Sequence, residues 1–123
     1  MRALWMLLAL VSLAAGPAWG QDPVAVDPTH YKVEFENDHV RVLRITYGPN
    51  EKSVMHHHPE GVAVYLKDLK GRFTLPDGQT IEEEGKAGEA VWTEAGEHLP
   101  ENMTDQPFEL ILVELKGESP GGE

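Results

Sequence analysis

Short apolar runs, separated by turn residues, follow one another from Tyr31 to Leu115 and constrain the fold more than any other feature. The runs are rich in β-branched and aromatic residues, and none has a helical period. Pro76-Asp77-Gly78 lies between two of them and predicts a hairpin closed at Asp77-Gly78. The last run, Phe108 to Leu115, is almost continuously apolar, which predicts a central strand buried on both faces. Eight or nine such strands predict one all-β domain over residues 30–116, a sandwich or barrel.

The two ends of the chain differ from this middle part. Residues 1–20 resemble a cleavable signal peptide, with a basic Arg2, an apolar stretch from Leu4 to Ala15, and small residues at Ala18 and Gly20. The apolar stretch is too short to span a bilayer comfortably, so we expect cleavage before Gln21 and a periplasmic or secreted protein. We expect residues 21–29 to be a flexible lead-in and residues 117–123 to be a disordered tail.

Charge and cysteine content exclude several classes of function. The 123-residue chain carries a formal net charge of −11, and loss of Arg2 makes the mature part more acidic still. Nucleic acids and anionic membranes bind basic patches, so neither is an expected partner after the signal peptide is removed. The chain has no cysteine, so any bound metal must be held by histidine and carboxylate side chains.

Three consecutive histidines, His56, His57 and His58, form the strongest candidate site. Side chains on a strand alternate between faces, so His56 and His58 point one way and His57 the other. Two imidazoles at this spacing could share a metal ion, with a third ligand from another part of the chain. The pattern also occurs on solvated surfaces, and that alternative stays open on spacing alone.

The stretches GPNEKSVMHHHPEGVAVYLKDLKG and GEAVWTEAGEHLPEN resemble the two sequence motifs of the cupin superfamily, in the same order. The first matches the family motif at Gly48, the His-x-His pair and Gly71. The second matches at Gly88, Gly96, His98 and Asn102. The resemblance implies a jelly-roll β-barrel in which His56, His58 and His98 hold one divalent metal ion.

Two positions depart from the family motifs. The second motif has Glu94 where the family has proline, and His98 comes one residue early. The family's metal-binding glutamate should fall at Val62, Ala63 or Val64, which are all apolar. This leaves a three-histidine site, a site completed by another carboxylate, or a barrel without metal. The carboxylates near the motifs in sequence are Glu60, Glu94, Glu97 and Glu101.

The resemblance permits more than one function. A metal held by three imidazoles could bind dioxygen or polarise an oxygen of a small-molecule substrate, as in a dioxygenase or an isomerase. The alternatives are a non-catalytic module that binds a metal or a small ligand, and a purely structural protein. The metal could be iron, manganese, nickel, copper or zinc, the catalytic residues are unknown, and the protein could form a homodimer. Tyr65 and Trp92 either fill the core or line a ligand pocket. The sequence contains no glycine-rich phosphate loop for an organic cofactor.

Overall fold

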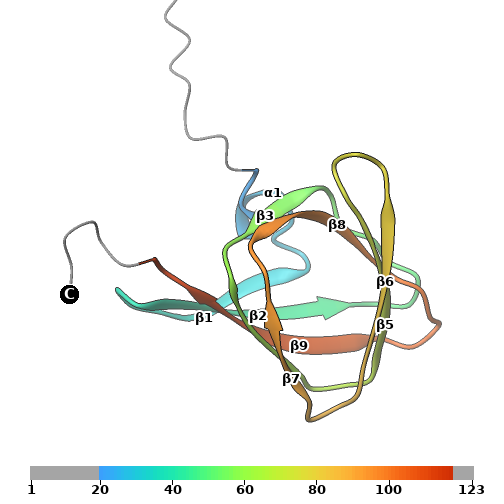
Figure 1. Ribbon diagram of the computed structural model, residues 1–123. Helices are drawn as coiled ribbons and strands as arrows, with labels where there is room; N and C mark the ends of the chain where they lie inside the picture. Colours follow the sequence, from blue (N-terminus) through green and yellow to red (C-terminus); the bar gives the residue numbers. More distant parts are fainter. Residues whose placement is uncertain (1–19, 118–123) are drawn as a thin grey trace, which may run out of the picture.

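The computed structural model describes residues 20–117, which form two antiparallel β-sheets that face each other (Figure 1). The larger sheet has the strand order β1-β2-β9-β4-β7, and the smaller has the order β3-β8-β5-β6. The predicted signal peptide, apart from Gly20, and the predicted tail, apart from Gly117, lie outside the described residues. The strands are β1 (Tyr31–Glu36), β2 (Val40–Tyr47), β3 (His56–His58), β4 (Gly61–Tyr65), β5 (Leu69–Thr74), β6 (Thr80–Gly85), β7 (Ala90–Thr93), β8 (Gly96–Asn102) and β9 (Phe108–Leu115).

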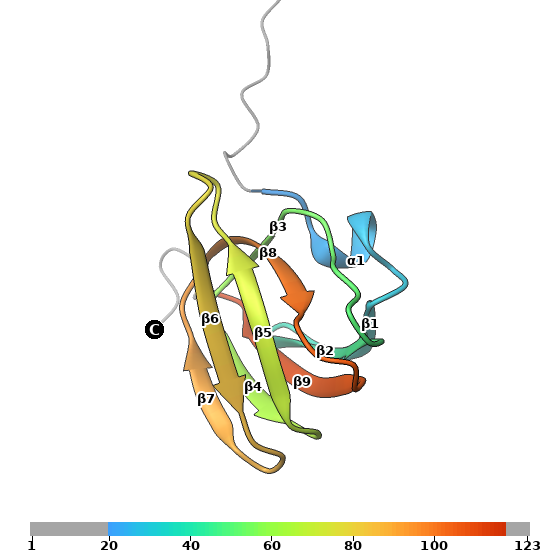
Figure 2. The same cartoon turned by 90° about the vertical axis from the view of Figure 1, so that its right-hand side faces the viewer.

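The all-β prediction is confirmed, and the predicted hairpin forms between β5 and β6. Figure 2 shows this hairpin along its length, with β5 and β6 side by side. Thr74 pairs with Thr80 at its closed end, and Gly78 has a positive φ of 88°. Glycine adopts this conformation without the steric cost that other residues incur, which is why the Asp-Gly pair marks the turn.

The prediction of a closed barrel needs correction, because neither sheet closes on itself. In the larger sheet β1 and β7 remain edge strands, and in the smaller sheet β3 and β6 do. No hydrogen-bonded pairing joins the two sheets among the described strands. The jelly roll is therefore an open sandwich, and its core is the space between two inner faces.

The core lies between the sheets, and β9 is its central strand. This strand pairs with β2 on one side and β4 on the other, so the prediction of a central strand is confirmed. Its alternate residues are buried, whereas those between them are only partly buried, so the prediction of burial on both faces is wrong. The buried apolar core consists of Tyr31, Leu43, Ile45, Tyr47, Ala63, Tyr65, Leu69, Phe108, Leu110 and Leu112.

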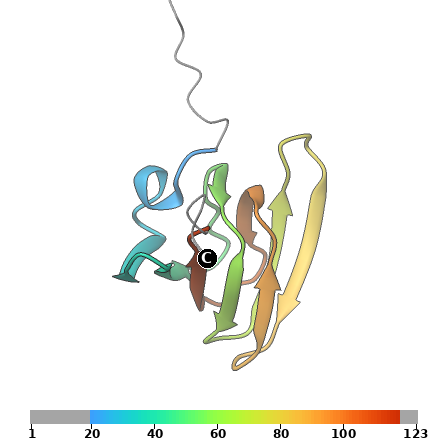
Figure 3. The same cartoon turned by 60° about the vertical axis from the view of Figure 1, so that its left-hand side comes forward.

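The segment over residues 21–29, predicted as a flexible lead-in, packs against the sandwich. It contains the single-turn helix α1 (Pro23–Val26), which lies beside β1 and contacts β1 and β3 (Figure 3). Pro23 is buried, and the backbone N–H of His57 donates to the carbonyl of Gln21 at 2.8 Å. These contacts come from distant residues, which a local reading of two prolines does not show. Within residues 20–117 no helix is long and apolar enough to cross a membrane.

Candidate metal centre

Strands β3 and β8 bring His56, His58 and His98 together. His56 and His58 are buried on one face of β3, whereas His57 between them is only partly buried. β3 pairs with β8 so that His56 lies directly opposite His98. The candidate ligand nitrogens of the three imidazoles all lie within 4.8 Å of one another. In the described part of the chain this is the one group of histidines and carboxylates gathered so closely.

The hydrogen bonds of the imidazoles leave their Nε2 atoms available. Nδ1 of His56 donates to the carbonyl of Val54 at 2.8 Å, and Nδ1 of His58 donates to Oε2 of Glu114 at 2.6 Å. Nε2 of His56 and of His98 is buried and has no hydrogen-bond partner. A buried nitrogen without a partner is costly unless a further group binds it. The donor set of three imidazole nitrogens therefore fits a divalent transition-metal ion.

The surroundings keep two of these imidazoles neutral. Burial lowers the pKa of His56 to about 4, with a further lowering from the neighbouring His58. Burial lowers the pKa of His98 on β8 to about 2, and the three histidines of β3 lower it further. Because only a neutral imidazole has a lone pair to offer, both side chains are in the ligand form at neutral pH.

No carboxylate belongs to this group among the described residues. Of the three positions where the family glutamate could fall, Ala63 is the buried one and lines the cavity next to the site, whereas Val62 and Val64 are only partly buried. The four glutamates considered as replacements lie elsewhere: Glu94 and Glu97 on the cavity wall, Glu101 with Arg72 at 3.1 Å, and Glu60 on the exposed surface. The geometry is that of three histidines.

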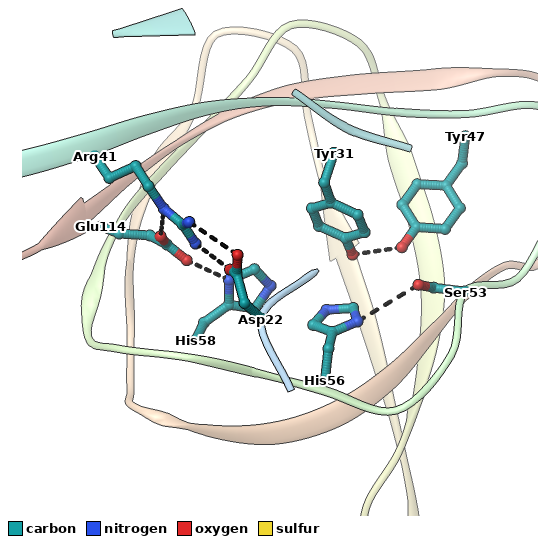
Figure 4. A network of polar contacts seen from close by, with 8 residues as sticks. All are labelled: Asp22, Tyr31, Arg41, Tyr47, Ser53, His56, His58 and Glu114. Carbon is teal, nitrogen blue, oxygen red and sulfur yellow. Dashed lines mark hydrogen bonds and ion pairs between the residues drawn. The ribbon is translucent and has the colours of Figure 1, made fainter. Parts of the chain in front are cut away.

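A charged network with the buried Glu114 at its centre supports His58, and sequence analysis did not find it. Oε1 of Glu114 accepts a hydrogen bond from Nε of Arg41 at 2.7 Å, and the Arg41 guanidinium also binds Asp22 at 2.5 and 3.2 Å (Figure 4). Burial alone would raise the pKa of Glu114, but the hydrogen bonds from His58 and Arg41 outweigh it and hold this pKa below the usual value. Glu114 is therefore ionised. The one sequence signal for it is a charged residue at an inward position of an apolar strand.

A second polar network lies behind His56, and sequence analysis also missed it. The Ser53 hydroxyl donates to Asp27 at 2.5 Å and lies 3.4 Å from Nδ1 of His56. Asp27 also accepts from Nδ1 of His30 at 2.7 Å. Next to these groups the hydroxyls of Tyr31 and Tyr47 are 2.5 Å apart (Figure 4), and burial raises the pKa of both phenols. These contacts place the buried Ser53 and Asp27 behind the Nδ1 side of His56.

A cavity of about 440 Å³ lies between the sheets, with His58 and His98 on its wall. Most of its lining is apolar or aromatic, and it includes no lysine or arginine. Tyr65 is buried in the wall, whereas Trp92 is 52 % exposed, so the core position considered for Trp92 is wrong. The acidic side chains on the wall are Glu83, Glu94 and Glu97. The cavity therefore suits a small, mostly apolar molecule.

Solved structures share this fold. A cupin domain from Bordetella pertussis Tohama I aligns with a TM-score of 0.65 and 22% identity, over 71% of this chain and 92% of that one. A protein with a double-stranded β-helix domain from Klebsiella pneumoniae aligns with a TM-score of 0.56 and 18% identity, over 73% and 78% of the two chains. The polyketide cyclase RemF from Streptomyces resistomycificus aligns with a TM-score of 0.52 and 22% identity, over 73% and 66%.

These likenesses show that the chain has the cupin fold, which confirms the resemblance found in the two sequence motifs. No protein-family model matches the chain, and no curated protein matches it. The activity must therefore be argued from the site, because one fold serves many activities.

Proposed function

We propose that this chain is an exported metal-dependent enzyme that acts on a small, mostly apolar molecule. His56, His58 and His98 would hold one divalent ion of iron, manganese, nickel, copper or zinc through their Nε2 atoms. The observation that carries the proposal is the convergence of three imidazoles, two of which have buried Nε2 atoms without partners. A metal held in this way supplies a Lewis acid that can polarise a substrate oxygen, or a centre that can bind dioxygen.

The residues of the chain would orient the substrate and exclude water. The apolar inner faces of both sheets surround a molecule in the cavity, with Phe73 stacked on the His98 ring at 4.5 Å between centroids. Because Ala63 stands at the inward position of β4, an apolar side chain occupies the place of a fourth protein ligand. Three neutral ligands leave the full charge of the ion available to a substrate oxygen.

The charge of the cavity wall supports a substrate without net negative charge. Its acidic side chains have no cationic counterpart on the wall, so a carboxylate or phosphate would meet repulsion away from the metal. Burial raises the pKa of Glu83, so of the three acidic side chains on the wall this one is best suited to transfer a proton. A neutral alcohol, ketone or phenol would gain apolar contacts with no such repulsion.

A second candidate function is a binding module that holds the metal or a ligand without chemistry. It is favoured by the position of Glu114, which bonds to His58 and Arg41 and is not among the residues that line the cavity. Turnover of a panel of neutral small molecules by the metal-loaded protein distinguishes an enzyme from a module.

Metal content tests the metal site, on which the proposed enzyme depends. Protein purified without an affinity tag should contain about one equivalent of a divalent metal by elemental analysis. Replacing His56, His58 or His98 with alanine should remove most of it, whereas His57→Ala should leave it nearly unchanged. Less than about 0.1 equivalent in wild type after incubation with each of the five metals would refute the metal site.

Export is a separate part of the proposal and has its own test. The intact mass of the soluble protein should correspond to a chain that begins at or near Gln21. Retention of Met1 on the folded soluble protein would contradict export by this route.

A further inference from the structure

Glu114 is a carboxylate at a position where the strand pattern calls for an apolar side chain. Phe108, Leu110, Leu112 and Glu114 are the buried residues of β9, and Glu114 is 2 % exposed. We propose that Glu114 is a positioning residue that orients His58 for the metal, and that Arg41 and Asp22 hold Glu114 in place. This proposal rests on the proposed metal site.

The contact between Glu114 and His58 determines which imidazole nitrogen faces the site. A carboxylate only accepts hydrogen bonds, so Nδ1 of His58 carries the proton and Nε2 carries the lone pair. The bond also fixes the ring about its own axis and makes the imidazole a stronger donor to a metal. The corresponding acceptor for His56 is the neutral carbonyl of Val54, so His58 is the ligand with ionic support.

Packing alone does not explain Glu114. A buried ion pair is on average no more stabilising than apolar side chains of similar volume, because removing both charges from water is costly. A leucine at this position would continue the apolar series of β9. The carboxylate is explained instead by the two bonds it makes, one to a candidate ligand and one to Arg41.

Arg41 connects Glu114 to Asp22, the residue just before α1. Strands β2 and β9 pair so that Arg41 lies opposite Glu114, and the guanidinium spans from that carboxylate to Asp22. A hydrogen bond to Arg41 lowers the pKa of Asp22, which keeps this carboxylate charged. The segment ahead of β1 therefore takes part in the site through two charge-assisted contacts (Figure 4).

The first measurement is made on the metal-free protein. Long-range proton–nitrogen correlation spectra of the imidazoles should show His58 with its proton on Nδ1. Glu114→Leu should shift the proton to Nε2, the form that an unsupported imidazole prefers. The proposal is overturned if His58 has the same tautomer in Glu114→Leu as in wild type.

The second measurement is the affinity for zinc, together with the visible spectrum of the cobalt-substituted protein. Glu114→Gln should weaken zinc binding by about 10–100-fold and change the cobalt spectrum, as expected for loss of a carboxylate behind a histidine ligand. Arg41→Lys, which keeps a cation, should restore part of the affinity lost in Arg41→Ala. The matched control is Glu109→Gln on the same strand, because the Glu109 carboxylate accepts a hydrogen bond from Arg44 on β2 but lies outside the site.

The outcomes separate this inference from the proposed function. If wild type binds zinc and Glu114→Gln binds it equally well with an unchanged cobalt spectrum, Glu114 is only structural and the inference is wrong. If wild type itself binds none of the metals, the proposed function fails and this inference fails with it. If Glu114→Gln and Glu109→Gln weaken binding equally, the effect is a general one of charge and also overturns the inference.

Discussion

Two parts of the cavity wall are built differently. The histidine wall, formed by His58 and His98 with His56 behind them, is backed by buried polar groups with bonds to distant strands. The β6–β7 wall, which includes Ile81, Glu83, Trp92 and Glu94, lies at the edge strands β6 and β7, and two of these side chains are exposed.

The difference between the walls indicates a division of roles. His56 is fully buried, whereas Ile81 and Trp92 are 46 % and 52 % exposed. Groups that must hold an ion need fixed geometry, and charge-assisted bonds provide it. Groups that admit a small molecule need only apolar surface and room to adjust. We therefore expect the histidine wall to tolerate few substitutions and the β6–β7 wall to tolerate many.

The largest expected effect is on stability and compares a buried leucine of the core with an exposed one. Leu112 on β9 is 4 % exposed, so Leu112→Ala should lower the free energy of unfolding by about 2–5 kcal/mol. Leu66, just after β4, is 43 % exposed, so Leu66→Ala should change it by less than about 0.5 kcal/mol. Urea unfolding of both variants measures this. Equal losses of unfolding free energy in the two variants would mean that Leu66 is covered in solution.

The sequence predicted the strands and the shared face of His56 and His58 well because both follow local rules. That the histidines bind a metal stays a prediction. Alternation on β3 separates His57 from its neighbours, and apolar runs between turn residues determine the other strands. The second motif identified His98, which spacing alone did not. Ala63, one of the three positions at which the family glutamate could fall, is the one whose side chain is buried.

The supporting groups could not be predicted, because their partners are far apart in the chain. Arg41 and Glu114 are 73 positions apart, and Ser53 and Asp27 are 26 apart. Strand pairing brings them together, and periodicity carries no information about pairing. The exposure of Trp92 also follows from strand pairing, because Trp92 lies opposite Val62 on the outer side of the larger sheet, whereas Val91 lies opposite the inward Ala63.

The next prediction uses pH to test whether the histidine wall makes the fold sensitive to acid. The pKa values of His56 and His98 lie below 6.5 in the folded protein, at about 4 and about 2. Between 6.5 and these values the unfolded chain binds more protons, so the free energy of unfolding should decrease as pH falls. Urea unfolding of the metal-free protein at about pH 7.5 and 5 should show a loss of a few kcal/mol.

A matched pair of variants identifies the source of that loss. His56→Asn should make stability less dependent on pH, because it removes one buried imidazole. His39→Asn is the control, because His39 is exposed. A flat profile in wild type, or an equal change in both variants, would show that the histidine wall is not the cause.

The smallest expected effect tests the β6–β7 wall through the charge of a ligand. Trp92 is the one tryptophan after residue 20 and borders the cavity, so its fluorescence in a chain that begins at Gln21 should respond to a bound ligand. In metal-free protein, 4-phenylbutanol should bind roughly tenfold more tightly than 4-phenylbutyrate, because the anion faces Glu83 and Glu94 without a cation on the wall.

Glu83→Gln should reduce this preference a few-fold, since it removes one of the charges. Glu82→Gln is the control, because Glu82 is exposed on the same strand, and it should leave the preference unchanged. Equal binding of the alcohol and the carboxylate would contradict a substrate without negative charge, while leaving the metal site on the opposite wall unaffected.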